Sequence, residues 1–114
     1  MPYLNIQTNI PIDAPAKADL VRRASALVAR ELAKPESYVM VAFAPEQPMM
    51  FAGSNAPCAF LQLKSIGLPA ARTTELSRVL CELLEETFNI PPKRVYIEFS
   101  DIDASYWGWD SATF

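Results

Sequence analysis

Apolar and polar residues follow two different periods along this chain. Alternation with period two is typical of strands with one buried face, and it occurs at 3–8, 39–43, 58 onwards and 95–99. Over about 14–33 and 70–88, apolar residues recur at helical spacing, which is typical of amphipathic helices. The pattern therefore predicts the order strand, helix, strand, and then the same order again.

Both expected helices have recognisable ends and one apolar stripe. Asp13 is placed to cap the first helix, and Lys34 and Pro35 end it. The second helix stops before Pro91 and Pro92, because proline cannot continue a helix. The stripes consist of Val21, Ala24, Val28 and Leu32 in the first helix, and of Leu76, Val79, Leu80, Leu83 and Leu84 in the second.

The two halves of the chain match each other at a shift of 56 residues, which places Val39 on Val95. A strand, helix, strand unit pairs its strands in parallel through a right-handed crossover. Two such units predict an α/β (α+β) fold, with a four-stranded sheet and both helices on one face. We expect a single domain over 1–114, with repeats over about 2–44 and 58–100 and a tail over 101–114.

The face of the sheet away from the helices needs a cover of its own. Depending on register, we expect its residues to be drawn from Leu4, Ile6, Val39, Val41, Phe60 and Ile97. Such a face is too apolar for water, so partner subunits are the expected cover. The tail adds a short aromatic stretch, whose rings either pack in a subunit interface or line a pocket, with interface packing as the default interpretation.

Composition excludes several classes of function. The chain has 114 residues, a net charge of -3, no histidine and two cysteines, Cys58 and Cys81. A histidine-based triad and a zinc site of the usual ligand types are therefore impossible within one chain. Its three glycines form no phosphate-binding loop, and its charge gives no footprint for nucleic acid. We expect no metal, no cofactor and no nucleic-acid partner.

The start of the chain has no apolar targeting or membrane-spanning segment, so we expect a cytoplasmic protein without a membrane partner.

Pro2 directly precedes the first expected strand. If Met1 is removed, Pro2 becomes a secondary amine fixed to the end of a strand. An α-amine has a pKa of about 7.7 to 8.0, which burial or a neighbouring cation lowers further. Pro2 is therefore a candidate general base, although a proline after a start codon is common without any such role.

Several short motifs occur in an order that resembles the macrophage migration inhibitory factor family, which includes D-dopachrome tautomerase. They are Pro2, Thr8-Asn9 with Pro11, Lys34-Pro35 before Tyr38, Gly53-Ser54 before Pro57-Cys58-Ala59, Ser65-Ile66-Gly67, Arg94-Val95-Tyr96-Ile97, and Gly108-Trp109 with Thr113-Phe114. The resemblance implies the tautomerase fold with a mixed sheet, a homotrimer, and active sites between subunits. It also implies keto–enol tautomerisation of small aromatic oxo acids, phenylpyruvate-like or dopachrome-like.

The resemblance also implies roles for particular residues. Pro2 would be the base, and Lys34 would pair with the substrate carboxylate. Ile66 would hold the ligand through its backbone, and a neighbouring subunit would supply Tyr96. The pocket walls would include Trp109 and Phe114, with Tyr3 and Tyr38 beside the site. From the residues alone, the favoured interpretation of Lys34 is a cation at a helix end, and Tyr96 can be a cross-strand packing residue.

The chain departs from the family pattern at several positions. Glu98 stands where close members have a neutral asparagine, so it could repel an anionic substrate or bind a hydroxylated one. Trp107 replaces a smaller residue at the pocket rim. Leu61 interrupts the family's Cys-x-x-Cys, so we expect no disulfide exchange. Ile12 stands where the family has an arginine credited with receptor contact, so we expect only weak cytokine-like signalling.

Two alternatives to a tautomerase remain open at this point. One is another reaction of the wider superfamily, such as decarboxylation or hydration of a small oxo acid, in which Glu98 could position water or substrate. The other is a non-enzymatic, cytokine-like interaction protein that keeps the pocket without a substrate.

Overall fold

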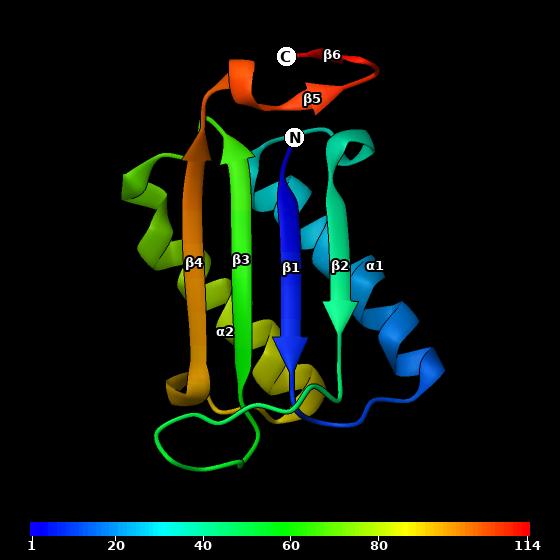
Figure 1. Ribbon diagram of the computed structural model, residues 1–114, viewed down its shortest axis with the longest axis vertical. Coiled ribbons are helices and arrows are strands. Elements are labelled where there is room, and N and C mark those ends of the chain that lie inside the picture. Colours follow the sequence, from blue (N-terminus) through cyan, green and yellow to red (C-terminus); the bar gives the residue numbers. More distant parts are fainter.

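The computed structural model describes all residues, Met1–Phe114, and contains one mixed sheet backed by two helices (Figure 1). Its elements are β1 (Tyr3–Thr8), α1 (Ala14–Leu32), β2 (Met40–Ala44), β3 (Ala59–Ile66), α2 (Thr73–Phe88), β4 (Val95–Ile102), β5 (Gly108–Trp109) and β6 (Ala112–Thr113). The sheet order is β2-β1-β3-β4. The pairs β1–β2 and β3–β4 are parallel, and the central pair β1–β3 is antiparallel. The expected fold class is confirmed.

The helix ends follow from local chemistry. The Asp13 carboxylate accepts a hydrogen bond from the Ala16 backbone N–H at 2.8 Å, which satisfies a donor that the first turn leaves free. α2 begins at Thr73, so the expected start at residue 70 is wrong. Residues 70–72 form a 3₁₀ turn, and the Thr73 hydroxyl donates to the Ala70 carbonyl at 2.9 Å.

The hydrophobic core lies between the sheet and the two helices. The paired residues Leu4 and Leu63 are both fully buried there. The wider core comprises Ile6, Leu20, Ala24, Val28, Ala59, Leu61, Leu68, Leu76, Leu80, Leu83, Leu84 and Ile90. Side chains alternate between the faces of a strand, so this register turns the intervening residues away from the helices.

The expected composition of the open face is therefore mostly wrong. Leu4 and Ile6 are buried in the core, and Val39, Val41 and Ile97 pack against it. Of the six residues expected on the open face, only Phe60 occupies a strand position whose side chain points to that face.

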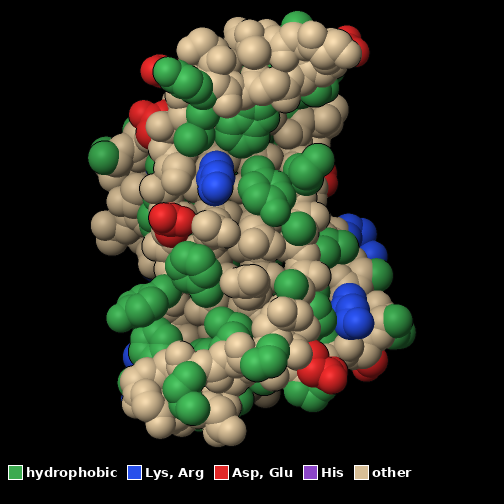
Figure 2. Space-filling view, viewed as in Figure 1, with side chains coloured by type: hydrophobic (Ala, Val, Ile, Leu, Met, Phe, Trp, Pro, Cys, Tyr) green, Lys and Arg blue, Asp and Glu red, His purple; other side chains and the backbone are tan.

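Polar groups cross the middle of the open face instead. The Asn5 amide donates to the Gln62 side-chain oxygen at 3.4 Å, and the Gln62 amide donates to the Glu98 carboxylate at 2.9 Å. Figure 2 shows this face, with hydrophobic side chains gathered toward its two ends and a basic and an acidic group between them. Neither α1 nor α2 is long and apolar enough to cross a membrane.

Candidate functional site

A pocket of about 490 Å³ lies at the end of the sheet where β1 begins. Four separate parts of the chain meet there, and one of them is the β5–β6 tail, which folds back over the amino terminus (Figure 1). Its lining residues are Met1, Pro2 and Tyr3 from the start of the chain, Ser37, Tyr38, Val39 and Met40 before and at the start of β2, Lys64 of β3, and Trp107, Gly108, Trp109 and Phe114 of the tail.

The amino terminus is held firmly at the floor of this pocket. The Met1 amine donates a hydrogen bond to the Tyr38 carbonyl oxygen at 2.5 Å. Pro2 is fully buried, and its carbonyl accepts from the Met40 N–H at 3.0 Å. Burial, followed by the positive charge of Lys34, lowers the pKa of the terminal amine below its ordinary value. The amine at this site therefore loses its proton at a lower pH than the amine of a free chain end does.

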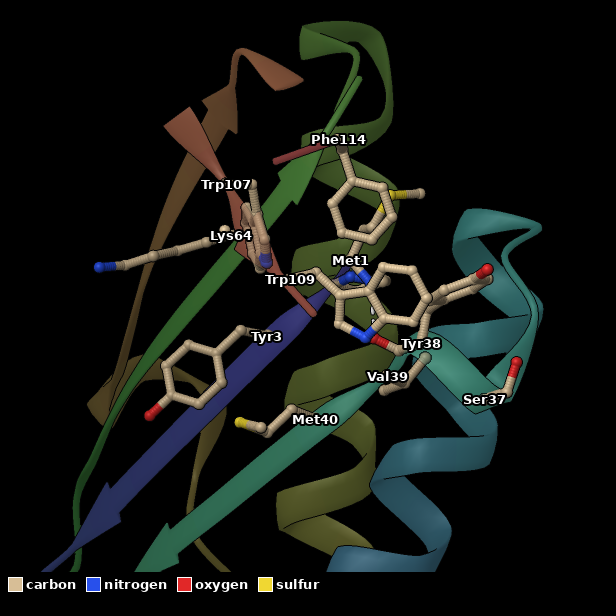
Figure 3. A pocket seen from close by; sticks show the side chains of 12 residues that line it. Met1, Tyr3, Ser37, Tyr38, Val39, Met40, Lys64, Trp107, Trp109 and Phe114 are labelled. Carbon is tan, nitrogen blue, oxygen red and sulfur yellow. Dashed lines mark hydrogen bonds between the residues drawn. The ribbon is translucent and has the colours of Figure 1, made fainter. Parts of the chain in front are cut away.

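Three aromatic rings form one wall of the pocket. The Tyr38 ring meets Trp109 and Phe114 edge-on, with centroid separations of 5.7 and 5.8 Å. Trp109 and Phe114 stack on each other at 5.4 Å. The β5–β6 hairpin positions the last two, and the Phe114 N–H donates to the Trp107 carbonyl at 3.1 Å. Figure 3 shows these rings grouped around Met1, which makes this wall suitable for a planar aromatic ligand.

Two lysines belong to this end of the molecule. Lys34 follows the end of α1, where its backbone N–H donates to the Ala29 carbonyl at 3.0 Å, and its charge acts on the terminal amine. Lys64 lies directly opposite Tyr3 in the β1–β3 pair. Both side chains are partly buried, and neither forms an ion pair within the chain.

Known proteins match this chain over its whole length. The model of the family described as macrophage migration inhibitory factor matches residues 1–114. The chain belongs to this family. A macrophage migration inhibitory factor homolog of Brugia malayi is 44% identical, and macrophage migration inhibitory factor of Mus musculus is 36% identical, in each case over 100% of this chain and 99% of the relative. A crystal structure of the homologue from Prochlorococcus marinus superposes with a TM-score of 0.92 at 40% identity, covering 98% of both chains.

The structure brings together six of the residues that the family resemblance singled out. They are Pro2, Tyr3, Tyr38, Trp107, Trp109 and Phe114. Lys34 does not line the pocket but lies near enough for its charge to act on the amine. Ile66, Tyr96 and Glu98 lie outside the pocket of their own chain. The roles assigned to all these residues stay predictions.

Sequence reasoning missed several lining residues, of which Met40 and Lys64 are the most notable. Met40 and Lys64 both pair with Tyr3, one from β2 and the other from β3. The alternation of β3 places Lys64 on the face opposite the core residue Leu63. That alternation was a usable signal, but only once the register between β1 and β3 was known.

An apolar hollow of about 350 Å³ lies at the opposite end of the sheet, where β4 begins. Tyr96 lines it together with Phe51, and their ring centroids are 4.7 Å apart. Arg94 lies behind this pair, with its guanidinium carbon 5.2 Å from the centre of the Phe51 ring. Its guanidinium donates to the carbonyls of Phe51, Ser54, Ala56 and Pro57 at 3.0 to 3.2 Å. Arg94 thus fixes the loop between β2 and β3.

No three side chains of the usual metal-ligating types converge anywhere in the chain. The groups in and beside the pocket that can act on a ligand are its amine, the lining residue Lys64, the nearby Lys34 and the aromatic wall. An amine with a lowered pKa accepts a proton, a lysine binds an anion, and an aromatic wall holds a ring.

Proposed function

We propose that this chain is a keto–enol tautomerase of phenylpyruvate-like or dopachrome-like oxo acids, with Pro2 as its general base after removal of Met1. One observation carries the proposal: the Met1 amine lies in an aromatic pocket where burial and Lys34 lower its pKa, and removal of Met1 would leave the Pro2 amine in the same pocket. A general base is most effective when its pKa is close to the working pH. Membership of the macrophage migration inhibitory factor family supports the same reaction class.

The proposed reaction moves one proton and changes nothing else in the substrate. The Pro2 nitrogen takes a proton from the carbon beside the carbonyl, and the proton returns to another atom of the conjugated system. Lys34 binds the substrate carboxylate, and its charge also contributes to lowering the pKa of an amine at this end of the chain. The substrate ring rests against Tyr38, Trp109 and Phe114.

Removal of Met1 is essential to this mechanism. While Met1 is present, the Pro2 nitrogen is part of a peptide bond and has no basic lone pair. Pro2 is already fixed by the Met40 hydrogen bond and by burial. Release of Met1 would therefore create the secondary amine on an ordered residue, which lowers the entropic cost of catalysis.

We further propose that the protein works as a homotrimer in which a neighbouring subunit contributes Tyr96 and Glu98. Tyr96 is in register with Phe60, and Phe60 pairs with Gln7. That register places Tyr96 about 16 Å along the strands from Pro2, at about 3.3 Å per residue. Within one chain Tyr96 cannot contact a substrate on Pro2, whereas its exposed ring is available to a second subunit.

The decisive experiment compares the same chain with and without Met1. Both forms can be purified without a tag, identified by intact mass, and assayed for phenylpyruvate enolisation. We expect the form that retains Met1 to be slower by about 100-fold or more, since a general base contributes on that scale. Pro2→Ala, also freed of Met1, tests the contribution of the secondary amine. Equal turnover by the two forms of the unmutated chain would overturn the proposal.

A further inference from the structure

The basic residues of this chain differ in how their charges are satisfied. Every arginine forms an ion pair or donates hydrogen bonds: these are Arg22, Arg23, Arg30, Arg72, Arg78 and Arg94. The side chains of the four lysines do neither. Lys17 and Lys93 are exposed to water, but Lys34 and Lys64 are partly buried. Partial burial removes water from a cation, and without an ion-pair partner this loss of hydration is not offset. An anion that binds to such a cation supplies the missing partner.

Lys64 lies beside the proposed reaction centre and, unlike Lys34, lines the pocket. It pairs with Tyr3, the residue next to Pro2, and directly opposed side chains on neighbouring strands have Cβ atoms about 5 Å apart. Figure 3 shows its ammonium extending away from Met1, on the side of the pocket remote from Tyr38. Its flexible four-carbon stem allows the charge to turn toward a ligand.

The acidic group nearest in the strand pattern does not neutralise Lys64. Lys64 is in register with Ser100 of β4, and Glu98 lies two residues earlier on the same face. The Glu98 carboxylate accepts the Gln62 amide at 2.9 Å and forms no ion pair with Lys64. The ammonium of Lys64 is therefore free within the chain.

We propose that the pocket selects aromatic oxo acids that carry two negative charges, with the 2-oxo carboxylate bound by Lys34 and a second carboxylate on the ring bound by Lys64. This inference rests on the proposed function, because it names the substrate class of the same site. The proton transfer is unchanged, so the substrate and product remain isomers and no other reactant is needed. The aromatic wall holds the ring between the two cations.

A binding experiment tests this selectivity without turnover. The matched probes are phenylacetate and 4-carboxyphenylacetate, which differ by one carboxylate, and their affinities can be measured by calorimetry on the Met1-free protein. We expect the dianion to bind about tenfold more tightly, because hydrogen bonds to charged groups contribute on that scale. Lys64→Met should remove this preference, Lys64→Arg should retain most of it, and the exposed-lysine control Lys93→Met should retain all of it. Equal affinities of the unmutated protein for both probes would overturn the inference.

A kinetic experiment separates this inference from the proposed function. The measured quantity is the ratio of kcat/KM for 4-carboxyphenylpyruvate to that for phenylpyruvate, which Lys64→Met should lower about tenfold by losing one charged hydrogen bond. If both substrates react and the ratio is unaffected by Lys64→Met, the selectivity inference fails and the tautomerase assignment stands. If neither substrate reacts while the binding preference persists, the tautomerase assignment fails and the dianion site stands. Thermal unfolding of each variant checks that the fold is intact.

Discussion

The two halves of the chain build the same scaffold but carry different groups at equivalent positions. The shift of 56 residues that superimposes them places Pro2 on Cys58, and Lys34 on Ile90. At the start of β1 the terminal amine lines an open pocket, and the partly buried, unpaired Lys34 lies near enough for its charge to act on that amine. At the corresponding position beside β3, Ile90 is fully buried in the core. At these equivalent positions only the first half keeps a charge available for a ligand, and the second half carries its unpaired, partly buried lysine, Lys64, within β3 instead.

One basic residue of the second half, Arg94, has a structural task. Arg94, which corresponds to Tyr38 in the first half, gives its donors to four carbonyls of the loop that closes this end of the sheet. Buried and partly buried polar groups normally find partners, so Arg94 follows the rule and Lys34 departs from it. The comparison indicates that, on a repeated scaffold, the cation left without a partner marks the functional end.

The largest expected effect comes from removing the satisfied cation. Arg94→Ala should lower the free energy of unfolding by about 3 kcal/mol, because several carbonyls lose a charged donor and the Phe51 ring loses its cation. Denaturant unfolding measures this loss. Arg94→Lys should recover only part of it, since one ammonium cannot reproduce the planar fork of a guanidinium. A loss below about 0.5 kcal/mol, the range of ordinary surface changes, would show that the loop is held by other contacts.

The unpaired cation should behave in the opposite way. Lys34→Met should change stability by less than about 0.5 kcal/mol, because no ion pair or side-chain hydrogen bond is lost. Its effect should fall on activity, with kcat/KM for phenylpyruvate lower by about tenfold through loss of the carboxylate partner.

The pH profile gives the same variant a more specific test. Lys34 lowers the pKa of the terminal amine in the folded chain, so its removal should raise that pKa. The base acts only when unprotonated, and the rise of kcat/KM with increasing pH should therefore move to higher pH. Lys17→Met, a change at an exposed lysine on α1, is the matched control and should leave the profile in place. An unmoved profile in Lys34→Met would mean that burial alone sets the amine's pKa.

The sequence predicted the element order well, because alternation and helical spacing are local properties. It failed where structure depends on contacts between distant segments. Whether Leu4 points to the core or to the open face depends on the pairing of β1 with β3, which sets Leu4 opposite Leu63. Composition alone could not decide between the two faces. Residues 70–72 have good helix formers, yet they form a 3₁₀ turn, and the preceding Leu68 N–H is bound by the Asp101 carboxylate at 3.0 Å.

The candidate site shows the same division. Pro2 and Tyr3 were predictable because they adjoin each other, and the aromatic tail was predictable from the family resemblance. Lys64 was not, since its place beside Tyr3 requires the antiparallel register of β1 and β3. Tyr96 and Glu98 remain predictions for a different reason. Their proposed role requires a second subunit, and a single chain places them outside its own pocket.

The smallest expected effect concerns how the two helices end. Both end on a residue in the left-handed conformation, Ala33 after α1 with φ 52° and Asn89 after α2 with φ 57°. This conformation costs an alanine roughly 1 kcal/mol, whereas asparagine tolerates it better. Ala33→Gly should therefore stabilise the protein by up to about 1 kcal/mol, and Asn89→Gly by clearly less. Denaturation midpoints of the two variants measure the difference.

The position of Ala33 makes this difference relevant to the site. Ala33 directly precedes Lys34, so a strained residue adjoins the unpaired lysine of the first half. If Ala33→Gly stabilises the fold without changing kcat/KM, the strain is a local cost of ending the helix with alanine. If the gain in stability is accompanied by a lower kcat/KM, the strained turn helps to position Lys34. Equal stabilisation by Ala33→Gly and Asn89→Gly would remove this contrast between the two helix ends and leave the residue after each cap, Lys34 or Ile90, as the difference between them.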